Sequence, residues 1–510
     1  MAHWTLRQQR SLLRASRAHS AIVHAASGLR SVSATPDARL AKWDDDDVAH
    51  FRRVLRDRPD AVLTDAHDTA PFTIDWVQKS KARGSHHVVL KPKTTHEVAQ
   101  ILQHCHARAL PVVPQGGNTG LVGGSVPVFD EIVLSLSAMN AVVNFDAISG
   151  VLVCEAGCVL EQLDSFVAKH GYMMPLDLGA KGSCQIGGNV STNAGGLRLL
   201  RYGSLHGTVL GVEAVLADGT IVDCLSTMRK DNTGYDLKQL FIGSEGTLGV
   251  VTKVSILTPP RSSSVNVAFL GCEDFGAVQK ILIDAKKHLG EVLSAVEFMD
   301  RQSLSLVLEQ QAWHSDPLET ACPFYVLLET AGSNSKHDME KLEAFLGHAM
   351  GIGTVVDGTV AQDATQARKL FAIREDIGIA LVSRGYVYKY DVSLPMSQFY
   401  QIAEKTRERV TPLGADVICY GHLGDSNVHL NVSTLAHDEK VFQQLEPWVF
   451  EFTSKYRGSI SAEHGIGTHK PPYLHLSKSE TAIQLMQQLK RMMDPKGILN
   501  PYKVLPPDGK

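Results

Sequence analysis

Three glycine-rich loops within one part of the chain restrict its fold more than any other feature. They read PQGGNTGLVGGS at residues 114–125, MPLDLGAKGSCQIGGNVSTNAGG at 174–196 and GSEGTLG at 243–249. Glycine and asparagine reach positive φ and let backbone N–H groups approach an anion closely. The loops carry neither the GK[ST] of a P-loop nor a GxGxxG turn. One such loop is typical of a flexible surface segment, but three together predict backbone wrapped along an extended, phosphate-bearing cofactor.

Short β-branched segments and helical segments alternate around these loops. The Val98, Ile101, Leu102 and Cys105 side chains recur at helical spacing within THEVAQILQHCHARAL. Asp218-Gly219 between two apolar runs predicts a β-hairpin. The other expected strands are HHVVLKP, residues 112–114, EIVLSL and GVLVCEAG. Mixed short strands and helices indicate an α+β domain.

The length of 510 residues exceeds what one hydrophobic core supports, so several domains are expected. The Pro259-Pro260 pair followed by RSSS is typical of a linker. The predicted division is a lead segment at 37–80, a first α+β domain at 81–260, a second at 261–495 and a tail at 496–510 that turns back.

The N-terminal residues 1–36 contain five arginines, six serines and no acidic residue. This composition is typical of a mitochondrial transit peptide that is removed from the mature protein, and an attached basic arm is the alternative. The first interpretation places the protein in the mitochondrion, specifically in the matrix.

The charge and cysteine content exclude several classes of function. A net charge of -4 argues against nucleic acid as the main partner. No run of 18 apolar residues is present, so we expect no membrane span. The eight cysteines form no CxxC pair, which predicts reduced, mostly buried thiols.

Two glycine-framed turns near the C-terminus bring together residues that bind metals. In YGHLGDSNVHLNVS, His429 and Asn431 should share one strand face, while His422 lies across the turn. SAEHGIG places Glu463 beside His464. Two histidines and a glutamate suit Zn²⁺ with a position left open for substrate. The alternative is that each histidine only makes hydrogen bonds within the protein.

Two further segments place cations where they could bind an anion. Arg374 lies within an apolar helical stripe of Leu370, Phe371, Ile377 and Leu381 and shares a face with Gly378. Lys389 alternates with Tyr388 and Tyr390, so it should lie on the opposite strand face. Solvated surface charges are one interpretation, and a clamp for carboxylates is the other.

Taken together, these motifs resemble one family of flavoproteins. PQGGNTGLVGGS, GGNVSTNAGG, YGSLHGTVLG, DNTGYDLKQLFIGSEGTLG, GHLGDSNVHLN, SAEHGIG and DPKGILNPYK resemble the vanillyl-alcohol-oxidase type, and the likeness runs from about residue 80 to 505. It implies an α+β fold, with an FAD-binding domain of two subdomains and an FAD-linked oxidase C-terminal domain that covers the substrate.

The resemblance also implies roles for particular residues. His422, His429 and Glu463 match zinc ligands; Asn431, Arg374 and Lys389 match substrate-binding residues; His464 lies beside the substrate and is our expected catalytic base. The positions that match FAD-binding residues are Pro114, Gln115, Gly116, Gly117, Asn118, Thr119, Gly120, Gly123, Gly124, Ser125, Leu176, Asp177, Gly182, Ser183, Gly187, Gly188, Asn189, Thr192, Asn193, Gly195, Gly196, Glu245, Gly246 and Asn500.

In some members of the family, a His or Cys in the first loop binds the flavin covalently. This chain has Asn118 in the first loop, so we expect non-covalent FAD. Gly378 replaces a threonine of related dehydrogenases and Ser426 replaces a glycine.

The implied reaction is oxidation of a 2-hydroxy acid, D-2-hydroxyglutarate, to its 2-oxo acid. D-lactate or another 2-hydroxy acid is the alternative substrate, and a non-catalytic flavin- and zinc-binding scaffold is the alternative role. The expected electron acceptor is electron-transfer flavoprotein, and a homodimer is one option for assembly.

Overall fold

A four-stranded sheet forms the N-terminal part of the computed structural model, which describes residues 35–56 and 58–507. Its order is β1-β2-β4-β3, with β2, β4 and β3 parallel and β1 antiparallel to β2. The strands are β1 Val62–Leu63, β2 Val89–Leu90, β3 Val112–Gln115 and β4 Ile132–Ser135, and the helices of this part are α2 Asp45–Val54, α3 Ala66–Thr69 and α4 Thr95–Arg108. The α4 face predicted from its spacing is buried. Most of the predicted transit peptide, residues 1–34, lies outside the described residues.

A five-stranded antiparallel sheet follows, in the order β5-β6-β9-β7-β8. The strands are β5 Val142–Asp146, β6 Val151–Glu155, β7 Val209–Val215, β8 Ile221–Cys224 and β9 Val250–Leu257, and the helices are α5 Leu160–Ala168, α6 Ile186–Ser191, α7 Leu199–Tyr202 and α8 Leu205–Thr208. The hairpin predicted at Asp218-Gly219 joins β7 to β8, with Gly219 at φ 88°. One hydrophobic core spans both sheets, so the two pack as one body.

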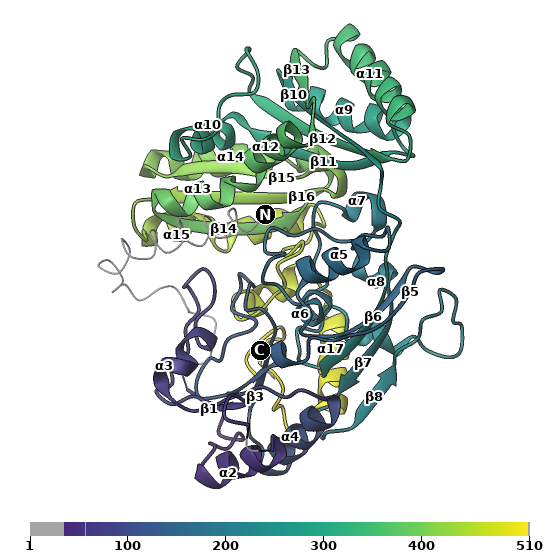
Figure 1. Cartoon of the computed structure of the whole chain (residues 1–510). Helices are drawn as coiled ribbons and strands as arrows, with labels where there is room; N and C mark the ends of the chain where they lie inside the picture. Colours follow the sequence, from purple (N-terminus) through teal and green to yellow (C-terminus); the bar gives the residue numbers. More distant parts are fainter. Residues whose placement is uncertain (1–34, 57, 508–510) are drawn as a thin grey trace.

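The C-terminal part contains a seven-stranded antiparallel sheet, in the order β13-β10-β12-β11-β15-β16-β14 (upper half of Figure 1). The strands are β10 Ser264–Cys272, β11 Leu293–Asp300, β12 Phe324–Gly332, β13 Asp357–Val360, β14 Tyr386–Ser393, β15 Asp416–His422 and β16 Asn427–Thr434. The helices are α9 Phe275–His288, α10 Arg301–Gln310, α11 Ser335–Gly351, α12 Ala364–Glu375, α13 Ile377–Arg384, α14 Gln401–Val410, α15 Glu439–Leu445 and α16 Trp448–Lys455.

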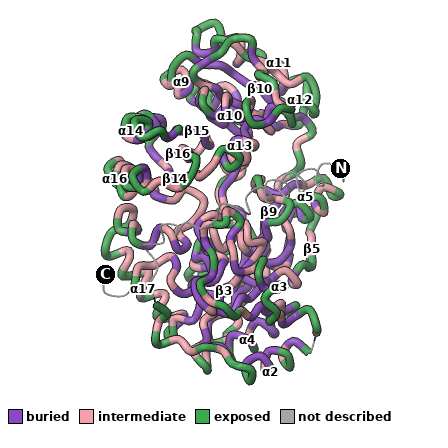
Figure 2. The backbone as a smooth tube through the Cα atoms, turned by 90° about the vertical axis from the view of Figure 1, so that its left-hand side faces the viewer, coloured by how far each residue is buried: buried purple, intermediate pink, exposed green. Residues whose placement is uncertain are grey.

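Each face of this sheet has its own hydrophobic core. Alternate residues of β10 belong to different cores, Ala268 and Leu270 to one and Val267 and Phe269 to the other, because side chains alternate along a strand. Helices α9, α11, α14, α15 and α16 cover the first face, and α10, α12 and α13 cover the second. Figure 2 shows the purple, buried backbone between green outer helix surfaces such as those of α11 and α14.

The predicted apolar stripe around Arg374 lies on two helices instead of one. α12 ends at Glu375 and α13 begins at Ile377, with Asp376 between them bound to His314 Nε2 at 2.9 Å. Leu370, Ile377 and Leu381 nevertheless enter one core, because the chain resumes a helix at once. The interruption was not predicted from the spacing.

The C-terminal segment returns to the N-terminal part after α17 Glu480–Met493 (yellow in Figure 1). Val112 N–H donates to the Ile498 carbonyl, and Asn500 N–H donates to the Val112 carbonyl, each at 2.8 Å. The tail therefore extends the four-stranded sheet beside β3. No helix among the described residues has the length and apolar character of a membrane span. The eight cysteines are unpaired, and all except the half-buried Cys224 are buried.

Candidate active site

The hairpin of β15 and β16 positions the first two histidines. In its register His422 lies opposite Asn427, and Tyr420 lies opposite His429. Val428, Leu430 and Val432 enter the core, so His429 and Asn431 share the other face, as predicted. Ser426 takes the turn position at φ 65°. The imidazole centroids of His422 and His429 lie 5.2 Å apart.

Glu463 is the point on which three imidazoles converge. Its Oε1 atom lies 3.9 Å from His422 Nε2, 3.5 Å from His429 Nε2 and 3.6 Å from His464 Nε2. The structure thus brings together all three residues predicted as metal ligands and the predicted base. Nitrogen and carboxylate oxygen around one point is the donor set that suits zinc.

Two buried acids that sequence reasoning missed lie behind the histidines. Glu297 on β11 accepts a hydrogen bond from His422 Nδ1 at 2.8 Å. Asp391 on β14 faces Nδ1 of His429 at 3.7 Å and Nδ1 of His464 at 3.6 Å. Asp391 also accepts from the backbone N–H groups of Glu463 and His464, at 2.9 and 3.0 Å. Acids on the outer nitrogens orient a metal-binding histidine and raise its basicity.

The local sequence around each of these two acids contained a feature that could have identified it as a site residue. Glu297 is the one charged residue of the mostly apolar LSAVEFM, and it is 1 % exposed. Asp391 lies two residues after Lys389, on the same strand face, and it pairs in register with His429. A buried acid in an apolar strand needs a partner, which makes it a candidate site residue.

The charges in this cluster shift one another's pKa in opposite directions. Burial lowers the pKa of His422, but the Glu297 carboxylate outweighs burial and raises it to about 9. Burial and the nearby His422 hold the pKa of His429 well below its ordinary value. Burial alone would raise the pKa of the Asp391 carboxyl, but His464, Lys470 and His429 hold it below its usual range.

The two predicted cations lie at the same cluster. Arg374 is 8 % exposed, lies 3.0 Å from Glu297 and stacks 4.5 Å above the Tyr420 ring centroid. Within the described part of the chain its Nε makes no hydrogen bond, and the Nη2 atom that lies 3.0 Å from Glu297 Oε2 forms an ion pair without hydrogen-bond geometry. Glu297 was not foreseen as its ionic partner.

Lys389 pairs in register with Asn431, so the two predicted substrate-binding residues are neighbours on adjacent strands. Burial lowers the pKa of Lys389. Among the described residues, no carboxylate lies within 4.0 Å of its ammonium group. A half-buried cation without an ionic partner among these residues is suited to a substrate carboxylate.

The three glycine loops meet in the N-terminal part. A Cβ on Gly117 would lie 2.0 Å from the Ser183 carbonyl, so the first and second loops touch there. Gly120 and Gly188 instead face open space. Gln185 Oε1 and Asn193 Oδ1 are buried acceptors without a hydrogen-bond partner in the described residues. Loops that touch, with open glycine faces and unused acceptors, fit an extended nucleotide such as FAD.

The predicted FAD-binding positions are distributed along these loops. The side chains of several of them form hydrogen bonds or ion pairs within the protein. Asn118 donates to the Ile74 carbonyl at 2.8 Å, and Ser125 Oγ donates to Asn118. Asn500 in the tail donates to the carbonyls of Gly124, at 3.0 Å, and Glu245, at 2.6 Å. Asp177 forms ion pairs with Lys181 and Arg198. The tail therefore ties the first loop to the third.

The glycine loops also contact the segment that carries Glu463 and His464. The Glu245 carboxylate accepts from the backbone N–H of Ile466 at 2.7 Å and of Gly467 at 2.9 Å. A Cβ on Gly195 in the second loop would lie 3.4 Å from Glu463 Oε2. The candidate cofactor cradle and the histidine cluster therefore share a wall, although neighbouring domains supply them.

Comparisons with known proteins agree with this arrangement. The model "FAD binding domain" matches residues 86–225, and the model "FAD linked oxidases, C-terminal domain" matches residues 261–504. Mitochondrial D-2-hydroxyglutarate dehydrogenase of Arabidopsis thaliana is 56% identical over 92% of this chain and 83% of the relative. The Bos taurus protein of the same name is 56% identical over 91% of this chain and 84% of its own length.

A solved structure supports the fold at lower identity. p-Cresol methylhydroxylase with substrate bound superposes with a TM-score of 0.72 at 16% identity, covering 90% of this chain and 96% of its own. At that identity the likeness concerns the fold alone. The α+β fold of the vanillyl-alcohol-oxidase type, predicted from the motifs, is confirmed.

Proposed function

The chain belongs to the family of FAD-linked oxidases that includes its D-2-hydroxyglutarate dehydrogenase relatives, and from this premise we propose that it oxidises D-2-hydroxyglutarate to 2-oxoglutarate. Non-covalent FAD, held by the three glycine loops and Asn500, supplies the two-electron acceptor for the C2 hydrogen. The division into an FAD-binding domain at 81–260, a substrate domain at 261–495 and a tail at 496–510 is part of this proposal.

One observation carries the proposal: Glu463 lies among three imidazoles and against Gly195 of the second glycine loop. This position puts a candidate metal and a candidate flavin next to the same small volume. A substrate there would reach both. A scaffold that only bound flavin and zinc would have no need for that proximity.

A zinc ion would be held by His422, His429 and Glu463, with Glu297 and Asp391 behind the histidine rings. Zinc supplies a Lewis acid for the C1 carboxylate and the C2 hydroxyl of a 2-hydroxy acid. The ligand atoms of His464 and Asp391 lie within 4.8 Å of those of His429 and Glu463, so His464 could also be taken for a ligand. We assign it instead to the proton, because an open position must remain for substrate.

His464 takes the proton of the substrate hydroxyl on its Nε2 atom. Asp391 accepts the backbone N–H of His464 and faces its Nδ1 atom, so it fixes the orientation of the ring. It also stabilises the imidazolium that forms when the proton arrives. The two roles belong to one carboxylate that is 2 % exposed.

Arg374 and Lys389 bind carboxylates, and Asn431 lies beside Lys389. Arg374, whose ionic partner in the structure is Glu297, and the half-buried Lys389 provide two cations, which favours a substrate with two carboxylates over a monocarboxylate such as D-lactate. This argument supports D-2-hydroxyglutarate as the substrate.

The cellular setting follows from the relatives, whose names place them in mitochondria. We propose that this chain acts in the mitochondrial matrix, passes its electrons to electron-transfer flavoprotein and assembles as a homodimer. The basic, acid-free segment at 1–36 supports import.

The test is to mix the flavin- and zinc-loaded protein anaerobically with D-2-hydroxyglutarate, L-2-hydroxyglutarate or D-lactate while recording flavin absorbance. Fast bleaching by D-2-hydroxyglutarate alone is expected. Bleaching by D-lactate alone would keep the reaction and replace the substrate. If none of the three bleaches a flavin whose presence is verified, the chain acts as a scaffold.

A further inference from the structure

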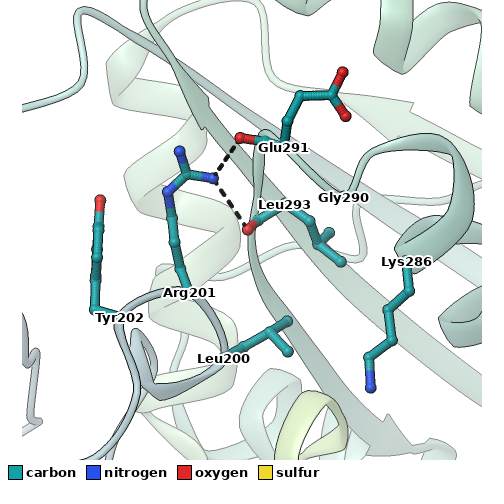
Figure 3. A pocket seen from close by; sticks show the side chains of 7 residues that line it. All are labelled: Leu200, Arg201, Tyr202, Lys286, Gly290, Glu291 and Leu293. Carbon is teal, nitrogen blue, oxygen red and sulfur yellow. Dashed lines mark hydrogen bonds between the residues drawn. The ribbon is translucent and has the colours of Figure 1, made fainter. Parts of the chain in front are cut away.

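A polar pocket lies between α7 of the N-terminal part and the chain from the end of α9 to the start of β11 (Figure 3). Its volume is about 540 Å³, and its lining residues are Leu200, Arg201, Tyr202, Lys286, Gly290, Glu291 and Leu293. The first three belong to α7, Lys286 to the last turn of α9, Leu293 to the start of β11, and Gly290 and Glu291 to the segment between α9 and β11. A pocket of this size holds a small organic molecule.

The charge of the pocket is positive. Among the described residues, neither Arg201 nor Lys286 has a carboxylate within ion-pair distance. The one acid of the lining, Glu291, is already paired with Lys341. In Figure 3 its side chain extends toward the opposite end of the pocket from the Lys286 ammonium. The cations come from different domains, so an anion between them would bridge the two.

Arg201 is held in place and still has donors left. One terminal nitrogen donates to the carbonyls of Glu291, at 3.0 Å, and Leu293, at 3.3 Å, as the dashed lines in Figure 3 show. A guanidinium group carries five N–H donors, so most of them are available to a carboxylate or phosphate. A pre-positioned guanidinium group loses little entropy when it binds.

The elements on both sides of the pocket contact the candidate active site. β11 runs from Leu293 in the pocket to Glu297, which holds His422. Leu200 packs on Gly424 so closely that a Cβ there would lie 2.8 Å from Leu200 Cδ2. Lys286 donates to the Gly424 carbonyl at 3.4 Å, and Gly424 is in the turn directly after His422. A molecule that drew α7 and α9 together would therefore act on the turn that carries His422.

We propose that this pocket is an effector site for a small polyanion, with one anionic group on Arg201 and another on Lys286. Polycarboxylates and polyphosphates share this chemistry. Binding changes the turnover of the enzyme through the 423–425 turn and β11. The effect on turnover rests on the proposed dehydrogenase function, whereas binding itself does not.

The test uses the flavin- and zinc-loaded protein at constant ionic strength, titrated calorimetrically with tricarballylate and, separately, with pyrophosphate. Lys286→Gln is the test variant, and Lys287→Gln is the matched control, since Lys287 shares the basic last turn of α9 without lining the pocket. We expect one of the two anions to bind, and Lys286→Gln to weaken that binding at least tenfold while Lys287→Gln leaves it unchanged. Arg201→Gln should weaken it similarly, with its folding checked by thermal unfolding.

Binding of tricarballylate but not pyrophosphate would indicate a carboxylate effector, and the reverse would indicate a phosphate effector. If Lys286→Gln and Lys287→Gln bind the anion with equal affinity, or if the wild type binds neither anion, the pocket is not the proposed anion site. Turnover of D-2-hydroxyglutarate is then measured with the bound anion present. Binding that leaves kcat and KM of the wild type unchanged overturns the effector role, while a protein that binds the anion but oxidises no 2-hydroxy acid contradicts the proposed function instead.

Discussion

At the scale of single residues, the candidate active site is built in two layers. Three imidazoles surround Glu463, and the carboxylates of Glu297 and Asp391 lie behind the imidazole rings. The inner layer consists of residue types that bind metals or move protons. The outer layer consists of buried acids, each with several partners. Substitutions in the two layers should therefore have different signatures.

Replacing His464 by asparagine tests the proton acceptor. We expect kcat to fall by roughly 10²–10⁴-fold, the range for loss of a general base. FAD absorbance and zinc content should stay as in the wild type, because neither is assigned to His464. The exposed His475 provides the matched control, and His475→Asn should leave kcat unchanged. Loss of zinc from His464→Asn would make His464 a ligand and not the base.

Replacing Glu297 by glutamine removes a buried charge and keeps the side-chain size. His422 and Arg374 lose their shared ionic partner, so zinc affinity should fall by about 10–100-fold, as for other second-layer acids. KM should rise with it, because Arg374 is no longer held. Zinc content is read by metal analysis after dialysis against a weak chelator. The exposed Glu309, replaced in the same way, is the control; a Glu297→Gln protein with wild-type zinc affinity would exclude the outer-layer role.

At the scale of elements, two short segments carry site residues into place. The α12–α13 pair presents Arg374 and Gly378 on either side of Tyr420: the guanidinium stacks on the ring, and a Cβ on Gly378 would lie 3.8 Å from the Tyr420 hydroxyl. The 461–467 loop presents Glu463 and His464, and Glu245 and Val122 anchor its end. Each segment allows one prediction.

Gly378→Thr should be accepted without a clash, because nothing else lies within 4 Å of the new Cβ. The added hydroxyl offers one hydrogen bond beside Tyr420, and a net value of about 0.5–1.5 kcal/mol corresponds to a KM lowered roughly 2–10-fold. Steady-state kinetics with D-2-hydroxyglutarate measure it. Gly347→Thr on α11, where a Cβ also meets nothing, should leave KM unchanged. An unaltered or raised KM for Gly378→Thr alone would show that the hydroxyl does not reach the substrate.

Gly465→Ala should displace the loop that carries His464. Gly465 has φ 83°, and its Cβ would lie 2.7 Å from Glu245 Oε1, a side chain held by two backbone N–H groups. Backbone strain alone costs about 1–2 kcal/mol, and the clash adds to it, so zinc and activity should be lost together. Gly353→Ala has the same strain, φ 72°, in open space. It should lower Tm slightly and retain zinc; equal zinc loss in both variants would mean that strain, and not displacement, is responsible.

At the scale of the whole molecule, the C-terminal tail closes the structure. It extends the sheet beside β3 and brings Lys503 into the interior, where the ammonium group donates to the Val126 carbonyl at 2.7 Å and to Asn500 Oδ1 at 2.6 Å. Tyr502 accepts from the backbone N–H of Asp37 at 2.8 Å, so the two ends of the described chain meet. The FAD-binding domain is thus completed by residues that follow the seven-stranded sheet in the chain.

Lys503 makes the stability of this closure depend on pH. Burial lowers its pKa to about 7 from an ordinary 10.5, so the folded state binds fewer protons than the unfolded state between these values. The free energy of unfolding contributed by Lys503 therefore rises with pH across that window, by up to about 1.4 kcal/mol per pH unit. Lys503→Met should flatten the rise in unfolding free energy between pH 7 and 8.5, measured by denaturant titration. Lys287→Met, at an exposed position, should follow the wild type; identical slopes for all three proteins would show that folding does not lower the pKa of Lys503.

Much of the inner layer followed from local sequence patterns. Alternation along β16 placed His429 and Asn431 on one face, and the glycine content of three loops predicted a wrapped cofactor. The strand-face prediction is confirmed because side-chain direction in a strand depends on near neighbours in the chain, and the loop prediction depends on the equally local backbone freedom of glycine. The break at Asp376 was missed because the helical spacing on either side of it is uninterrupted.

What only the tertiary structure decided is which segments are neighbours. Glu297 meets His422 because β11 pairs with β15, with these two residues in register across 125 positions of sequence. Asp391 meets His429 because β14 lies beside β16. The sequence by itself determined the residue types, the loops and the faces of the strands. Strand order and register depend on how whole faces pack into two cores, a long-range property that no local period encodes.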